Sequence, residues 1–192
     1  MFIQTHMLIG NHINNTINAT LPVSIRRSGY LFGCTLPDLL PGYLAVPHVK
    51  EPSLHFVSTL MTETLQTIPR SPQELLYYSI ELGIITHYVC DYFCQPHHNS
   101  TAGRAWDHAR YENQLARKFK QTDLKHLTVP MVIPFESADP TRLLTEYLDF
   151  KYSSYLNHPP STFLDICYSV QTSSTIVLSI LNNLSLLASR AA

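Results

Sequence analysis

The sequence predicts an all-α fold, a single-domain multi-helix bundle over residues 1–192. Three observations predict it. Several of the 13 prolines stand where an apolar run begins, and none needs to lie inside a helix. Apolar residues recur at steps of three and four, which is the helical period, whereas strand-like alternation is nearly absent. A length of 192 residues also suits one domain with a sizeable core.

The first three helices are expected in the N-terminal third of the chain. Thr5 is the expected N-cap of the first helix, and Thr20 is the expected N-cap of the second, which Pro22 would open. Pro52 opens the third, and the helical period is clear in its apolar residues Leu54, Val57, Leu60, Met61, Leu65 and Ile68. These signals predict helices over residues 5–18, 21–33 and 52–67.

The clearest helix start is Ser71-Pro72-Gln73-Glu74, a capping box with Ser71 as N-cap and Glu74 at the third position. Asp139 before Pro140 marks a later start in the same way. The segment from Leu127 to Pro134 looks extended, but its prolines favour a loop or an edge. The remaining predicted helices span residues 72–94, 105–121, 140–156 and 162–188.

Charge is scarce and balanced in this chain. Charged residues make up 14%, against about 25% in average globular proteins. The 13 cationic and 14 anionic residues give a net charge of −1. Proteins that bind nucleic acids usually carry a clear basic excess, so the balance disfavours that class. Ten histidines stand out against these numbers and are the first candidates for a function.

Neither a secretory signal nor a membrane span is expected. The N-terminal residues lack a charged start, an apolar run and a cleavage site. Polar residues interrupt the best candidate span, Ile176 to Leu187. The four cysteines form no disulfide framework and no C-x-x-C unit, so a thiolate zinc site is not expected, and Cys90 and Cys94 should pack as small apolar residues. We therefore expect a cytoplasmic protein.

Two histidine–carboxylate pairs indicate a metal site. His87 and Asp91 are four residues apart on one predicted helix, so both project from one face. His108 and Glu112 repeat this spacing on the next helix, and His97 lies in the turn between the two helices. Mixed imidazole and carboxylate ligands suit zinc, or another first-row divalent ion, better than calcium.

A simpler interpretation applies to one such pair taken alone. A single histidine and aspartate at this spacing usually form a surface hydrogen bond. Two pairs and His97 within 26 residues, in a chain so poor in charge, favour metal binding instead. His98, beside His97, is an alternative to it.

The run His87-Tyr-x-x-Asp91, then Gln95-Pro96-His97, then His108-x-x-x-Glu112 resembles the signature of the zinc-dependent phospholipase C family. The single-strand-specific zinc nucleases are a related branch with the same fold. The resemblance covers about 110 of the 192 residues, and nothing after about residue 120 is recognised. It implies an all-α domain that holds a cluster of three metal ions and hydrolyses phosphodiesters.

The resemblance also implies the other ligands. His6 corresponds to the family's N-terminal helix histidine, which shares one metal with Asp91. Asp38 resembles the aspartate that bridges metals or serves as general base. A further histidine is either His48 or His55, with a slight preference for His48 because it lies in a loop. One metal is then expected at Asp38, His48 or His55, His87 and Asp91, and a second at His97, His108 and Glu112.

The third metal is less well defined by this sequence. The secreted phospholipases bind it with the amino group and carbonyl of an N-terminal tryptophan, whereas Met1 stands here, five residues before His6. We therefore expect two or three zinc ions. The expected function is phospholipase C-like hydrolysis of a phospholipid or another phosphodiester. The alternatives are a zinc nuclease, with nucleic acid as substrate, and a non-catalytic helical protein stapled by metals. The oligomeric state stays open.

Overall fold

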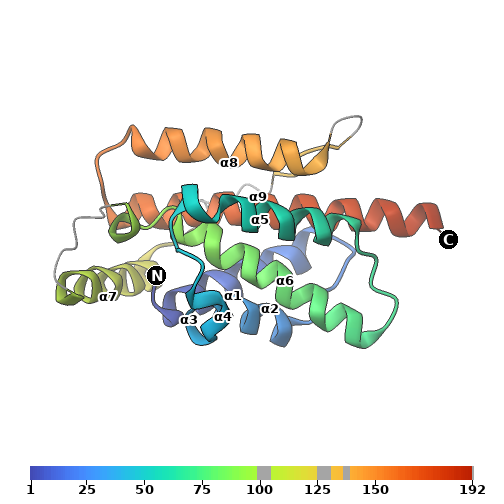
Figure 1. Cartoon of the computed structure of the whole chain (residues 1–192), viewed down its shortest axis with the longest axis horizontal. Helices are drawn as coiled ribbons and strands as arrows, with labels where there is room; N and C mark the ends of the chain where they lie inside the picture. Colours follow the sequence, from blue (N-terminus) through green and yellow to red (C-terminus); the bar gives the residue numbers. More distant parts are fainter. Residues whose placement is uncertain (99–104, 125–130, 136–138, 192) are drawn as a thin grey trace.

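The computed structural model describes residues 1–98, 105–124, 131–135 and 139–191, and in these ranges the protein is all-α, as predicted, with no strand. Figure 1 shows the helices packed side by side along the long axis. The elements are α1 (Ile3–Thr20), α2 (Arg27–Gly33), α3 (Leu36–Leu39), α4 (Pro41–Leu44), α5 (Lys50–Gln66), α6 (Pro72–Asp91), the 3-10 turn η1 (Gln95–His97), α7 (Ala105–Gln121), α8 (Pro140–Leu156) and α9 (Thr162–Ala191).

Two of the predicted N-caps are confirmed. The Ser71 hydroxyl accepts a hydrogen bond from the Glu74 backbone N–H at 3.1 Å, and the Glu74 carboxylate accepts one from the Arg70 N–H at 2.7 Å. The Asp139 carboxylate accepts from the N–H groups of Thr141 and Arg142. Each cap satisfies N–H groups that have no partner inside the helix.

The two other predicted N-caps are wrong. The first helix begins at Ile3 with Phe2 as N-cap, and the Phe2 carbonyl accepts from the N–H of Thr5 at 2.8 Å. Thr20 is the last residue of α1, because the following Leu21 precedes a proline and is extended. The second helix starts at Arg27 rather than at residue 21, and the short helices α3 and α4 were not predicted.

Helices α6 and α9 form the centre of the bundle. Helix α6 packs against α2, α5 and α9, and α9 also contacts α1, α7 and α8. Helix α9 is long and apolar enough to cross a membrane by length and composition. However, 83% of its apolar window is buried inside the protein, as expected for a core helix.

Helices α2 and α6 approach each other through two glycines. A Cβ atom at Gly83 would lie 2.2 Å from the Tyr30 carbonyl oxygen, and one at Gly33 would lie 2.1 Å from that of Ile80. Only glycine permits this backbone approach. The contact places the end of α2, and α3 after it, against the C-terminal half of α6.

Candidate metal centre

The C-terminal end of α6 brings together side chains from distant parts of the sequence. All of the predicted site residues with described side chains meet here, except His55. They come from α1, α3, the segment before α5, α6 itself, η1 and α7, and are His6, Asp38, His48, His87, Asp91, His97 and Glu112.

His87 is held in one orientation by the α2–α6 contact. Its ring is fully buried, and its Nδ1 lies 2.9 Å from the carbonyl oxygen of Cys34, which follows α2 directly. A carbonyl only accepts hydrogen bonds, so Nδ1 carries the proton and Nε2 is free to bind a metal. The Nε2 atom faces Asp91 Oδ2 at 3.2 Å and Asp38 Oδ1 at 3.7 Å.

Asp91 lies between two sets of nitrogen atoms. Its Oδ2 is 2.7 Å from His48 Nδ1, on the side of His87. Its Oδ1 is 3.3 Å from His6 Nε2 and 3.6 Å from His97 Nε2. One fully buried carboxylate can thus serve two neighbouring metal ions, one through each oxygen.

The amino group of Met1 also reaches Asp91. It contacts Asp91 Oδ1 and lies 3.0 Å from His97 Nε2 and 3.5 Å from Glu112 Oε1. Burial alone would raise the pKa of Asp91, but the positive charge of this amino group, together with the surrounding histidines, outweighs it and holds that pKa well below its usual value. The carboxylate is therefore ionised, as a metal ligand must be.

His6 is the least satisfied side chain of the cluster. Only 1% of it is exposed, and its ring stacks on that of His87 with 3.8 Å between the ring centroids. Within the described residues, neither of its ring nitrogens makes a hydrogen bond. Burial lowers its pKa well below the usual value. A neutral, buried imidazole whose Nε2 lies 3.3 Å from a carboxylate oxygen, without a hydrogen bond to it, is suited to metal binding.

Asp38 and His48 form the more exposed side of the cluster. Asp38 Oδ1 lies 3.7 Å from His48 Nδ1, and the two side chains are 22% and 16% exposed. Burial raises the pKa of Asp38 against the opposing charge of His87. Burial would lower the pKa of His48, but the hydrogen bond to Asp91 and the charges of Asp91 and Asp38 together outweigh it and raise that pKa.

The second expected site is partly described. His97 Nε2 lies 3.9 Å from Glu112 Oε1, and Glu112 is buried. Cys94 joins them, because its Sγ and their ligand atoms all lie within 4.8 Å of one another. Cys94 was predicted to pack only as a small apolar residue, and its position three residues before His97 is the one sequence signal that indicates this proximity. The side chain of His108 on α7 lies outside the described residues.

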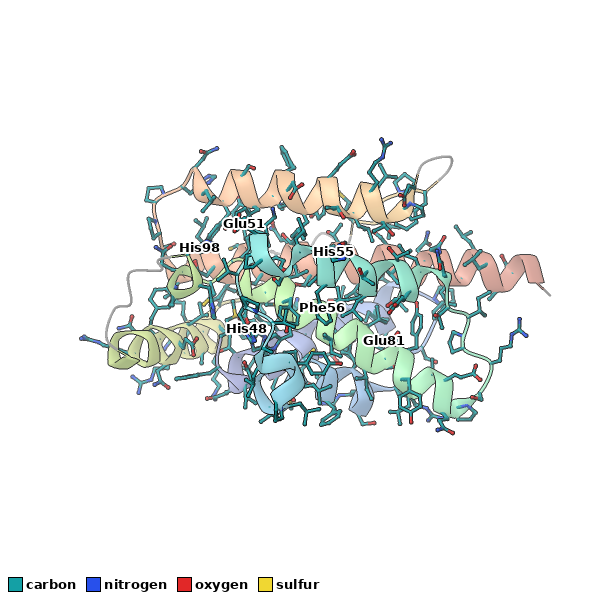
Figure 2. The ribbon with its side chains drawn as sticks, viewed as in Figure 1. His48, Glu51, His55, Phe56, Glu81 and His98 are labelled. Atoms are coloured by element: carbon teal, nitrogen blue, oxygen red, sulfur yellow. The ribbon has the colours of Figure 1, made fainter. Side chains whose placement is uncertain are left out.

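His55 and His98 point elsewhere. His55 is exposed on α5, and Figure 2 shows it on the outer side of that helix, apart from His48. His98 Nδ1 lies 3.1 Å from the Tyr152 hydroxyl, so its ring faces α8. Neither histidine belongs to the groups of described residues that could hold a metal, which are His6–His87–Asp91, Asp38–His48–His87 and Cys94–His97–Glu112.

A pocket of about 540 Å³ opens onto the cluster. Asp38, His97 and Glu112 stand on its metal-site wall, and the start of α1 supplies its other lining residues, Met1, Phe2, Ile3 and Gln4. The pocket therefore joins the metal-site carboxylates and His97 to apolar residues at the start of α1.

The donor atoms fit zinc. The ligand atoms around Asp91 lie about 3–4 Å apart, the separation expected of atoms that bind one ion at about 2.0–2.2 Å. The ring nitrogens of the buried His6 make no hydrogen bond within the described residues, which is an independent indication that a ligand binds there. Imidazole and carboxylate donors in one cluster are typical of zinc.

Comparison with known proteins gives one match. The family model described as zinc-dependent phospholipase C matches residues 5–191, which includes the C-terminal third that carries no recognisable motif. No curated protein and no solved structure matches the chain.

Proposed function

The chain belongs to the zinc-dependent phospholipase C family, and we propose that it is a metal-dependent hydrolase that cleaves a phosphodiester bond in phospholipids. The observation that carries this proposal is the position of Asp91. Its two oxygens face two separate sets of ligand atoms, so the cluster can hold metal ions close enough to act on one phosphate.

We propose the metal ligands from the distances between described side chains and, for His108, from its spacing to Glu112 in the sequence. One zinc ion would bind Asp38, His48, His87 and Asp91, with His48 rather than His55 as the second histidine. A second would bind His97, His108 and Glu112, with Cys94 nearby. His6 and Asp91 would hold a third beside the amino group of Met1.

When bound, zinc ions neutralise charge on a phosphate and supply an activated water as nucleophile. Asp38 is the residue we propose to orient that water and accept its proton. It lines the pocket, it is partly exposed, and its Oδ1 lies 3.7 Å from the ring nitrogens of both His48 and His87. Phe2 and Ile3 would exclude bulk water from the other side of the pocket.

The pocket lining supports a lipid substrate over a nucleic acid. Among its described lining residues there is no lysine or arginine, and the whole chain has a net charge of −1. Nucleic-acid sites normally carry cationic side chains for the phosphate backbone. The apolar lining at Met1, Phe2 and Ile3 instead suits acyl chains. We also propose that residues 1–192 form one domain, because α9 contacts helices from both halves of the chain.

The proposal is tested with the purified protein. Elemental analysis should give two or three zinc ions per chain. The zinc-loaded protein should release the phosphorylated headgroup from phosphatidylcholine vesicles and leave single-stranded DNA and RNA intact. Degradation of the nucleic acids with no lipid cleavage would identify a nuclease, and absence of zinc would refute the whole assignment.

A purely structural role for the metals is tested with His87→Ala. If the variant keeps its helical circular dichroism but loses lipid cleavage, the cluster is catalytic. If it unfolds, and zinc-loaded wild-type protein cleaves no diester, the metals only staple the helices.

A further inference from the structure

Asp165 is a buried carboxylate outside the metal cluster that contacts both segments of the second metal site. It lies in the first turn of α9, and none of its surface is exposed. Its Oδ2 accepts a hydrogen bond from the Gln95 backbone N–H at 3.0 Å and from the Tyr111 hydroxyl at 2.7 Å. Its Oδ1 accepts one from the Tyr155 hydroxyl of α8 at 2.8 Å.

The two donors on Oδ2 stand directly beside metal-site residues. Gln95 is the first residue of η1, which ends at His97. Tyr111 precedes Glu112 on α7. The N–H groups at the start of a helical turn have no partner within that turn, so Asp165 caps η1 from another helix. One carboxylate therefore fixes η1 relative to α7, and with them the separation of His97 from Glu112.

Three hydrogen-bond donors face the two oxygens of Asp165 at the N-terminus of α9, which carries partial positive charge. Burial nevertheless raises the pKa of this carboxyl group. A buried carboxylate is costly without such partners, and packing alone would be served better by an apolar side chain.

We propose that Asp165 is a positioning residue for the His97–Glu112 metal site, which extends the function of the cluster into the C-terminal third of the chain. The inference rests on the proposed function. Replacing a residue that hydrogen-bonds to the segments carrying the metal ligands typically lowers metal affinity by about 10–100-fold.

The test compares Asp165→Asn with Ser179→Ala in the full chain. Asn has one accepting oxygen and cannot satisfy three donors. Ser179, also fully buried on α9, accepts a hydrogen bond from the Ile133 backbone N–H at 2.9 Å, so its replacement removes a similar buried bond between α9 and the backbone of another segment. It lies 14 residues further along the helix, about 21 Å away.

Zinc affinity is measured by competition with a chromophoric chelator, and site geometry by the visible absorption of the Co²⁺-substituted protein. We expect Asp165→Asn to lower the affinity for one zinc ion by about 10–100-fold and to change the Co²⁺ spectrum. Ser179→Ala should leave the zinc affinity and the Co²⁺ spectrum unchanged. Equal losses of zinc affinity in the two variants would overturn the inference, because they would reflect a loss of protein stability alone.

A milder variant covers the case in which Asp165→Asn does not fold. Tyr111→Phe keeps the ring and removes one hydrogen bond to Asp165. We expect it to lower the affinity for the same zinc ion by about tenfold. Unchanged zinc affinity in Tyr111→Phe would then overturn the inference. If wild-type protein binds zinc and neither variant alters its affinity, this inference fails alone, whereas a wild-type protein without zinc refutes the proposed function itself.

Discussion

Replacing Gly83 by alanine tests whether the α2–α6 contact builds the site. The new Cβ would lie 2.2 Å from the Tyr30 carbonyl oxygen and 2.7 Å from the Cys34 nitrogen, both backbone atoms that cannot rotate away. Helix α2 would have to move by about 1 Å, and overpacking of this kind costs about 1–3 kcal/mol. We take the upper end because the clash is with backbone. Alanine regains about 1 kcal/mol of helix propensity, which leaves a net loss of about 2 kcal/mol in the free energy of unfolding.

Urea denaturation followed by circular dichroism measures this loss as a lower midpoint at constant slope. Gly42→Ala is the matched control, since no atom lies within 4 Å of its added Cβ, and its stability should be unchanged or raised by up to about 1 kcal/mol. Moving α2 also displaces the Cys34 carbonyl from His87 Nδ1. Zinc affinity should therefore fall together with stability in Gly83→Ala, whereas Gly42→Ala should keep its zinc affinity. A Gly83→Ala protein as stable as the wild type would refute the reasoning.

Three further predictions concern the metals and a cap. Removing zinc with a chelator should lower the unfolding temperature by roughly 5–10 °C for each zinc ion that was present at about 100 times its Kd, because each such ligand of the native state contributes about 2.7 kcal/mol. An unchanged scanning-calorimetry transition would argue against a bound metal. His48→Ala should abolish lipid cleavage and lower zinc content, whereas the exposed His55→Ala should leave both unchanged, and the reverse pattern would reassign the ligand. Ser71→Ala should cost about 1 kcal/mol in urea denaturation without altering zinc content, since Ser71 caps α6 at the end opposite to Asp91.

Local sequence signals predicted the helices well where caps and periodicity agreed. The capping box at Ser71 and the cap at Asp139 are present in the structure, and the predicted helices over 105–121 and 140–156 match α7 and α8. The signals failed where packing decided the outcome. Pro22 could open a helix, but the chain stays extended there until Arg27 because it must cross from the end of α1 to the face of α6.

The site was predictable as far as its residues share a helical face or a known spacing. His87 and Asp91 are close because of the helical repeat, and any helical structure would have brought them together. No such rule reveals that the Cys34 carbonyl orients His87, or that Asp165 reaches Gln95 across 70 residues. Backbone groups and long-range partners depend on how helices pack, which the spacing of residues does not encode.

The clustering of histidines at the end of α6 is related to the buried carboxylate of Asp91. Asp91 is fully buried in a chain with few charged residues, and an ionised carboxylate in such surroundings is strongly unfavourable unless cationic or donor groups surround it. Four histidines each place a ring nitrogen within 3.6 Å of one of its two oxygens: His6, His48, His87 and His97. Neutral imidazoles can share the carboxylate with a metal ion, which lysine or arginine could not. The amino group of Met1 and the hydrogen bond with His48 make the buried aspartate tolerable, and the neighbouring histidines make the end of α6 a place where zinc can bind.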